Sequence, residues 1–220
     1  MAEIIFRTRT RDRVALETPM AEEEIARFNR LQSQRFDELC ERFLEPLAPD
    51  VMERMERIVA AAEIQPGETV LDVGTGTGAL IPLIRRYRPG RMIACDLSAR
   101  MLEQVARIHP DVERHQGDIR DLGLRGSSVD VVFMNGMFGN IADKEGAIGN
   151  IGRMLRPGGR VVISHPEGGA FVAGIARREP FPITPLPSRE EASALLGAAG
   201  LTVRDYIDEE KLLICLAIKA

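Results

Sequence analysis

Three glycines within five residues are the feature of this sequence with the clearest chemical use. The segment 71–78 reads LDVGTGTG, with glycine at positions 74, 76 and 78. Glycine has no Cβ atom and tolerates positive φ, so the backbone here can turn sharply and approach a ligand closely. If a helix follows the turn, its unpaired N–H groups favour an anion. The segment therefore predicts a site for a nucleotide-like ligand that carries a carboxylate or a phosphate.

The glycine turn taken alone is compatible with more than one nucleotide. Gly74-x-Gly76-x-x-Ala79 also satisfies the looser dinucleotide fingerprint, in which a helix N-terminus holds a pyrophosphate. Asp96 follows about 20 residues later, where a carboxylate can accept hydrogen bonds from both ribose hydroxyls. Asp118 and Ile119 then pair an acidic side chain with an apolar one, a combination that can hold an adenine amino group and the face of its ring.

Short β-rich runs alternate with helical runs after residue 65, which predicts an α/β domain. Crossover connections between such runs give parallel strands that are covered on both faces. The last two strands are joined by a tight turn at 208–210 and must be antiparallel. We therefore expect a Rossmann-like seven-stranded mixed sheet flanked by helices, with six parallel strands and one antiparallel strand near the edge. The expected strands are 69–73, 91–95, 112–115, 129–135, 160–165, 201–207 and 212–218.

Apolar residues at helical spacing before the sheet predict an N-terminal helical cap. One such pattern spans residues 22–44, and Asp50 with Glu53 predicts a capping box that opens a further helix. Near the other end, Ser188 with Glu191 predicts a capped helix through Ala199. Glycines at 146, 149 and 152 share a helix and should allow close helix packing, with a homodimer contact as one option.

These elements predict a single domain with a basic arm in front of it. We expect a mobile basic arm over residues 1–20, where arginine occupies positions 7, 9, 11 and 13. The domain is expected to cover 21–220, with a helical cap at 21–65 and a Rossmann-like core at 66–220. The segment 166–187 is a long connection rich in proline, which is typical of a lid or substrate loop.

Four motifs follow one another along the chain: LDVGTGTG at 71–78, DLSARML at 96–102, GD at 117–118 and LRPGGR at 155–160. In this combination and order, the sequence resembles the class I S-adenosylmethionine-dependent methyltransferases, particularly the small-molecule branch that includes ubiquinone and menaquinone methyltransferases. The resemblance covers approximately residues 66–220. It implies methyl transfer from S-adenosylmethionine to a small organic acceptor, with S-adenosylhomocysteine as the product.

The same resemblance implies a role for each residue of the cofactor site. The glycine turn would hold the methionine end, Asp96 the ribose, Asp118 and Ile119 the adenine. Leu97 and Met101 would lie against the adenosine face, and Asn135 and Gly136 would border the sulfonium. The turn residues concerned are Asp72, Gly74, Thr75, Gly76, Thr77 and Gly78.

Methyl transfer from a sulfonium uses a donor that is already activated, so the main task of the protein is to align the reactants and exclude water. A base would help where the acceptor atom carries a proton, and His165 is the candidate because it leaves the fifth strand at the carboxyl edge of the sheet. The alternative reading of His165 is a residue that ends the strand and bonds the loop backbone. Two other functions stay open: a cofactor-binding accessory protein without turnover, and an NAD-dependent oxidoreductase.

The composition disfavours several classes of partner. A formal net charge of -4 lacks the cationic surface that non-specific nucleic-acid binding needs. No apolar run has the roughly 20 residues that span a bilayer, so we expect no membrane contact. The cysteines at 40, 95 and 215 are odd in number and far apart, which predicts neither a disulfide framework nor a metal site and favours a cytoplasmic location.

Overall fold

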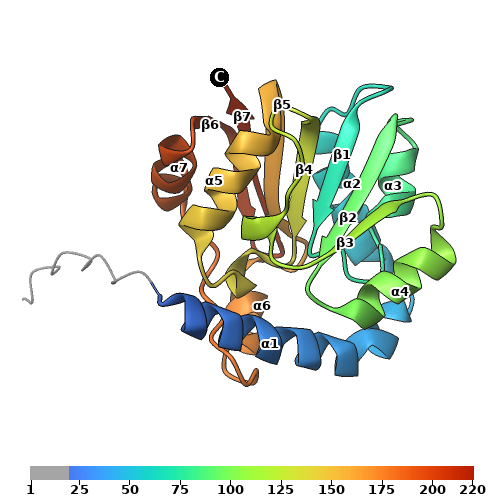
Figure 1. The fold of residues 1–220 in the computed structure, drawn as a ribbon, viewed down its shortest axis with the longest axis vertical. Helices are drawn as coiled ribbons and strands as arrows, with labels where there is room; N and C mark the ends of the chain where they lie inside the picture. The colour runs from blue at the N-terminus through green and yellow to red at the C-terminus, as the bar shows by residue number, and fades with distance from the viewer. Residues whose placement is uncertain (1–19) are drawn as a thin grey trace, which may run out of the picture.

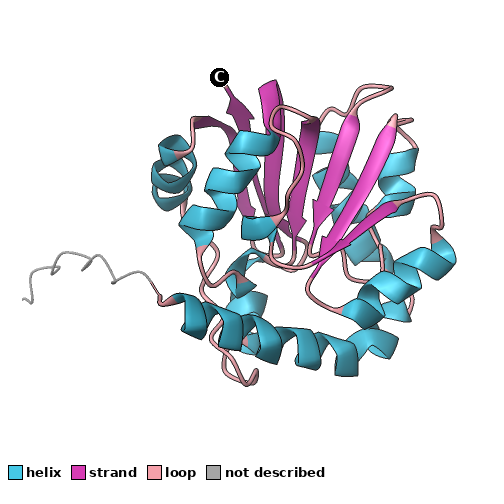
Figure 2. Ribbon diagram, viewed as in Figure 1, coloured by secondary structure: helices cyan, strands magenta, loops and turns pink. Residues whose placement is uncertain are grey.

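The structure, a computed structural model, describes residues 20–220 as one seven-stranded sheet with helices on both faces (Figure 1, Figure 2). The predicted basic arm lies outside the described residues, apart from Met20. The strands follow the order β3-β2-β1-β4-β5-β7-β6. Their bounds are β1 Thr69–Val73, β2 Arg91–Asp96, β3 Glu113–Gln116, β4 Val129–Asn135, β5 Leu155–His165, β6 Leu201–Glu209 and β7 Leu212–Lys219.

The direction of the strands agrees with the predicted mixed sheet. β7 runs antiparallel to both of its neighbours, β5 and β6. The pairs from β3 through β5 are all parallel. β7 is second from the edge, so the prediction of six parallel strands and one reversed strand near the edge is confirmed. β1 and most of β4 are buried on both faces, which explains their nearly continuous apolar sequence.

Two helices cover each face of the central sheet. α5 (Lys144–Met154) and α7 (Arg189–Ala198) share a core cluster with one face, and α2 (Pro49–Ala61) and α3 (Ile81–Arg85) pack on the other. α4 (Ala99–Ile108) contacts β2 and β3. Gly152 of α5 leaves room for the backbone of Ala199, because a Cβ atom there would lie 2.9 Å from the Ala199 oxygen. The close helix packing predicted for this glycine therefore occurs within the chain.

Helix α1 (Glu22–Leu39) and the short helix η1 (Cys40–Leu44) cross the carboxyl ends of the strands instead of a sheet face (Figure 1). Within the predicted cap at 21–65, only this first part spans the strand ends. α2 contributes Met55, Ile58 and Val59 to the core beneath the sheet. The remaining short helices are η2 (Ile119–Asp121), η3 (Phe138–Asn140) and α6 (Gly168–Ile175).

Two local predictions fail for identifiable reasons. α2 begins at Pro49 with Ala48 as N-cap and no side-chain cap, so the capping box expected from Asp50 is absent. Proline at the first helical position already has the φ that a helix needs, and Asp50 instead pairs with Arg54 at 3.0 Å. β5 begins at Leu155, ahead of the expected position 160, because Leu155 pairs with Val129 across a register shift in β4. The capping box of Ser188 and Glu191 is confirmed.

Candidate functional site

A cavity of about 600 Å³ lies between α1 and the carboxyl ends of β1, β2 and β4. Its volume is in the range of about 300–1,000 Å³ that small-molecule sites occupy. All but two of the cofactor residues predicted from the sequence line it. They are Gly74, Thr75, Gly76, Thr77, Asp96, Leu97, Met101, Asp118, Ile119, Asn135 and Gly136.

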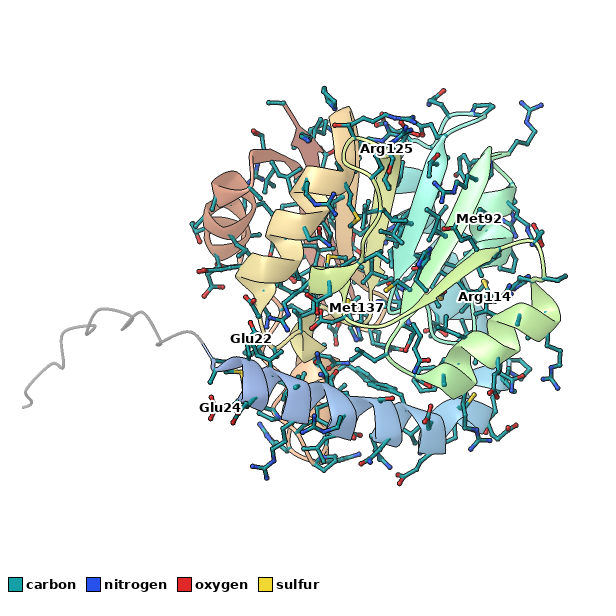
Figure 3. The ribbon with its side chains drawn as sticks, viewed as in Figure 1. Glu22, Glu24, Met92, Arg114, Arg125 and Met137 are labelled. Atoms are coloured by element: carbon teal, nitrogen blue, oxygen red, sulfur yellow. The ribbon has the colours of Figure 1, made fainter. Side chains whose placement is uncertain are left out.

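The glycine turn has the backbone geometry that its sequence predicts. Gly74 and Gly76 have φ values of +64° and +56°, a region that side chains with a Cβ atom rarely adopt. A Cβ atom on Gly74 would lie 2.6 Å from Cγ of Met137, so this position also depends on close contact. Met137 lies at the lower end of the sheet in Figure 3, above α1. Nothing lies within 4 Å of the Cβ position at Gly76, which leaves that stretch of backbone open to a ligand.

Asp72 and Gly78 are the two predicted residues that do not line the cavity. Asp72 is 4% exposed, and one carboxylate oxygen accepts a hydrogen bond from Thr75 Oγ1 at 2.8 Å. Burial raises the pKa of Asp72 to about 7. A Cβ atom on Gly78 would lie 2.8 Å from Ile81 and 3.1 Å from His109, so this glycine serves helix packing. Both residues therefore shape the turn from behind.

Asp96 ends β2 with its carboxylate held by the backbone. Oδ2 accepts the N–H of Gly76 at 2.8 Å, and Oδ1 accepts the N–H of Ser98 at 2.9 Å. Burial raises the pKa of Asp96, while these backbone donors oppose that effect. The carboxylate lines the cavity with acceptor positions still free, because each ionised oxygen can accept two hydrogen bonds. This arrangement fits a ribose with two neighbouring hydroxyls.

Asp118 has more partners than its sequence position suggests. Oδ1 accepts the backbone N–H of Arg120 at 2.9 Å, and Oδ2 accepts Arg120 Nε at 2.9 Å. Oδ2 also accepts the side-chain amide of Asn29 in α1 at 2.7 Å. Asp118 thus caps η2 and binds α1 while it lines the cavity. Three of its four acceptor positions are used, and one remains for an adenine amino group.

Helix α1 contributes site residues that the sequence analysis did not identify. Its side chains bond the loops after three strands: Asn29 binds Asp118, Gln32 donates to the Asn140 carbonyl at 2.8 Å, and Ser33 donates to the Leu97 carbonyl at 3.0 Å. Asp37 accepts the Ser98 hydroxyl at 2.5 Å. Gln32 is only 3% exposed. The available signal was the presence of polar residues at helical spacing on the face that also carries Ile25 and Phe28.

The opposite part of the cavity is apolar. Aromatic rings from three segments meet there: Phe36 of α1 lies 6.1 Å from Phe43 and 6.3 Å from Phe181, measured between ring centroids. Phe171 of α6 also lines the cavity. An ion pair of Arg35 and Glu179, 2.8 Å between Nε and Oε2, joins α1 to the segment after α6. This half of the cavity suits an apolar molecule in contact with the residues that border the cofactor half.

His165 lies at the boundary between the two halves, at the end of β5. Its Nδ1 accepts a hydrogen bond from the backbone N–H of Glu167 at 3.1 Å, so His165 bonds the backbone of the loop that follows the strand. Burial lowers the pKa of His165 to about 4, so the ring is neutral at physiological pH. Its ring centroid lies 5.5 Å from that of Phe171. With Nδ1 occupied, the ring has no free nitrogen lone pair with which to accept a proton.

Comparisons with known proteins agree with this geometry. A family model described as a methyltransferase domain matches residues 71–163. Over this segment the chain is similar to a methyltransferase domain. The match begins at β1 and ends within β5, so it covers the strands that surround the cofactor half of the cavity.

Individual relatives extend the match of the methyltransferase domain. A demethylmenaquinone methyltransferase of Streptomyces avermitilis is 30% identical over 145 residues, 62% of this chain and 62% of that protein. One of Thermus thermophilus is 28% identical over 203 residues, 77% of this chain and 92% of that protein. Several curated relatives are longer, and this chain spans less than two thirds of their length. A SAM-dependent methyltransferase of Aquifex aeolicus has the same fold, with TM-score 0.64, 19% identity and 86% and 98% coverage of the two chains.

Three further features of residues 20–220 bear on partners. No group of three or more His, Cys, Asp or Glu side chains in this part of the chain could hold a metal ion. None of the helices described is long and apolar enough to cross a membrane. Cys40, Cys95 and Cys215 are all buried and free.

Proposed function

We propose that this protein transfers the methyl group of S-adenosylmethionine to a small organic acceptor. The observation that carries the proposal is the single cavity in which Gly74, Asp96 and Asp118, from three different loops, meet an apolar wall. Bound S-adenosylmethionine supplies a methyl group on a positively charged sulfur. In the proposed assignment the glycine turn holds the methionine end, Asp96 the ribose and Asp118 the adenine, as the family resemblance implies.

The protein would then align the acceptor and exclude water, which are the main requirements for an in-line displacement on an activated donor. The rings of Phe36, Phe43 and Phe181, together with the ion pair of Arg35 with Glu179, cover the apolar half of the cavity, which we assign to the acceptor. We assign the segment 166–187 to the acceptor as a lid or substrate loop. The similarity to demethylmenaquinone methyltransferases supports a small organic acceptor. The free cysteines suit a reducing compartment, so a cytoplasmic location is part of the proposal.

Titration calorimetry with S-adenosylhomocysteine tests the cofactor assignment, with NAD as the competing ligand. We expect S-adenosylhomocysteine to bind and NAD not to bind. Asp96→Ala should weaken it by about 10- to 100-fold, because hydrogen bonds to a charged group contribute about 1.5–3 kcal/mol. Asp205→Ala is the matched control, since this carboxylate is half exposed on β6 and pairs with Arg204. Tight NAD binding, or equal affinity in the Asp96 variant, would contradict the assignment.

Turnover needs a separate measurement, because a cofactor-binding accessory protein would pass the calorimetric test. Incubation of the protein with methyl-labelled S-adenosylmethionine and a pooled metabolite extract should give a labelled product of low molecular mass. Asp96→Ala should reduce the label and Asp205→Ala should not. Labelling of protein or nucleic acid alone would redirect the proposal to a macromolecular acceptor.

The homodimer suggested by the glycines of α5 is checked by light scattering of the same preparation.

A further inference from the structure

The acceptor half of the cavity has no carboxylate that is both buried and free to accept a proton. Glu179 accepts two hydrogen bonds from Arg35, at 2.8 and 3.3 Å. Glu167 lies 3.6 Å from Arg54, and Glu45 is exposed beyond η1. Asp96 and Asp118 are held within the cofactor loops. The remaining candidate among the described lining residues is His165, so its hydrogen bonding decides what chemistry the acceptor can use.

The geometry of His165 fixes which of its nitrogens faces the acceptor. Nδ1 accepts the N–H of Glu167 and therefore carries no hydrogen, so the hydrogen of the neutral ring is on Nε2. Nε2 has no hydrogen bond within residues 20–220. In that range, the fully buried side-chain polar atoms without a hydrogen-bond partner belong to Arg54 and Gln104, so Nε2 of His165 is not fully buried. His165 lines the cavity, so Nε2 is open to it. Phe171, tilted 41° to the imidazole, restrains the ring.

We propose that His165 binds the methyl acceptor as a hydrogen-bond donor through Nε2–H, and that the acceptor is a weak acid, such as a phenol, enol or thiol, bound as its anion. This inference rests on the proposed function. An anionic oxygen or sulfur has three lone pairs, so it can accept the hydrogen bond of Nε2–H and still attack the methyl group. A neutral amine has one lone pair and would lose its nucleophile to the same contact.

The charges of the reaction favour the same class of acceptor. The donor has a positively charged sulfur, and the apolar wall of Phe36, Phe43 and Phe181 keeps the effective dielectric constant low, which strengthens its attraction for an anion. The charged groups beside His165 are Glu167 on its own loop and Arg54 of α2, which pair with each other at 3.6 Å. In the transfer, a lone pair of the anion forms the bond to the methyl carbon as the carbon–sulfur bond breaks. The electron pair of that bond goes to sulfur, and both products are neutral at the reacting atoms.

Nitrogen NMR of the wild-type protein bound to S-adenosylhomocysteine tests the state of the ring without an acceptor. The chain has three histidines, so selective labelling gives a simple spectrum in which His165→Gln identifies the signal of His165. We expect an unprotonated Nδ1 and a protonated Nε2 that do not change between about pH 5 and 8. A hydrogen on Nδ1, or a titration within this range, would overturn the proposal and restore His165 as a base.

A matched pair of variants then separates the donor role from the loop role. The amide nitrogen of His165→Gln can reach the position of Nε2, whereas that of His165→Asn can reach only the position of Nδ1. With para-nitrophenol as the probe and S-adenosylmethionine replaced by its charged analogue sinefungin, absorbance reports the bound anion. We expect the wild type and His165→Gln to bind the anion of para-nitrophenol about tenfold more tightly than its neutral form, and His165→Asn to show a smaller preference, because only the charge of sinefungin then favours the anion. An equal preference in all three, or none in the wild type, would contradict the donor role.

Failure of the proposal for His165 can be distinguished from failure of the proposed function. Affinity for S-adenosylhomocysteine reports the cofactor site, and it should be the same in both His165 variants and the wild type. If that affinity is present but the ring titrates, only the assignment of His165 and the acceptor class is wrong. If S-adenosylhomocysteine does not bind any of the three proteins, the proposed function itself is wrong.

Discussion

At the scale of single residues, Asp72 stabilises the glycine turn while its burial opposes the ionised form. The carboxylate accepts a hydrogen bond from the hydroxyl of Thr75, and no positively charged side chain contributes to its pKa shift. A buried carboxyl in this position is more stable protonated, since burial penalises the charge. The free energy of unfolding should therefore depend on pH in part through this group.

Replacement of Asp72 by asparagine measures this effect. The folded pKa of about 7 lies above the ordinary value of 3.8, so the native state binds more protons than the unfolded state between these limits. The contribution of Asp72 to wild-type stability should fall as pH rises through this window. Asp72→Asn retains an acceptor for Thr75 and has no charge to bury. We expect its Tm to exceed that of the wild type at pH 8 by several degrees and to match it near pH 4.

Equal Tm values at both pH values would contradict the raised pKa. Asp205→Asn serves as the matched control, because it makes the same chemical change at an exposed carboxylate. The measurement uses thermal unfolding without cofactor, since a bound ligand would add its own linkage to the stability.

At the scale of elements, α1 is the part of the chain that joins the cofactor loops. Its hydrogen bonds to Asp118, Asn140 and Leu97 connect it with the loops after β3, β4 and β2. Each such bond contributes about 1 kcal/mol. These contacts, together with Phe28 against Phe181 at 5.7 Å between centroids, hold the helix across the strand ends.

Removal of two of these contacts should loosen α1 without unfolding the sheet. The double variant Asn29→Ala, Ser33→Ala loses the bonds to Asp118 and Leu97, about 2 kcal/mol in total. We expect affinity for S-adenosylhomocysteine to fall about tenfold and amide exchange in residues 22–39 to accelerate. Arg30→Ala, an exposed position on the same helix, is the control. Unchanged exchange and affinity would mean that α1 does not close over the cofactor.

The central strands could be predicted from the sequence because a sheet buried on both faces requires nearly uninterrupted apolar runs, as residues 129–134 illustrate. The start of β5 could not, since Pro157 and Gly158 read as a break while Leu155 pairs with Val129 across a bulge. The turn residues of the cofactor site share one short segment, and glycine spacing reveals it. The partners of Asn29 and Gln32 lie about 90 to 110 residues away, and nothing local indicates them. The proposed role of His165 depends on one backbone N–H of the following loop, which the sequence does not reveal.

At the scale of the whole molecule, the sheet edges are polar. β3 presents Glu113, Arg114 and His115 at one edge, and β6 carries Arg204 and Asp205 at the other. Charged edge strands discourage pairing with another chain. Each face of the sheet has a core cluster that includes side chains of β1, β4, β5 and β7, so cofactor binding at the strand ends should stabilise the molecule as one unit.

Cofactor binding should therefore raise the temperature of a single unfolding transition. At a concentration of S-adenosylhomocysteine about 100 times its Kd, the native state gains about 2.7 kcal/mol. For a domain of this size that corresponds to an increase in Tm of about 5 to 11 °C. Scanning fluorimetry with S-adenosylhomocysteine and with NAD checks this, and we expect no increase with NAD. A shift confined to one of two transitions would show that the strand ends unfold separately.

The position of α1 also has a kinetic consequence. Since the helix bonds the loops of the proposed cofactor site, departure of spent S-adenosylhomocysteine past α1 would require these bonds to break, and a new donor that enters past α1 would have to arrive before they form again. Exit of the used donor, more than the methyl transfer itself, would then set the pace of repeated turnover. An enzyme limited in this way works faster when its surroundings remove S-adenosylhomocysteine, so its output would follow the ratio of fresh to used donor more closely than the supply of acceptor.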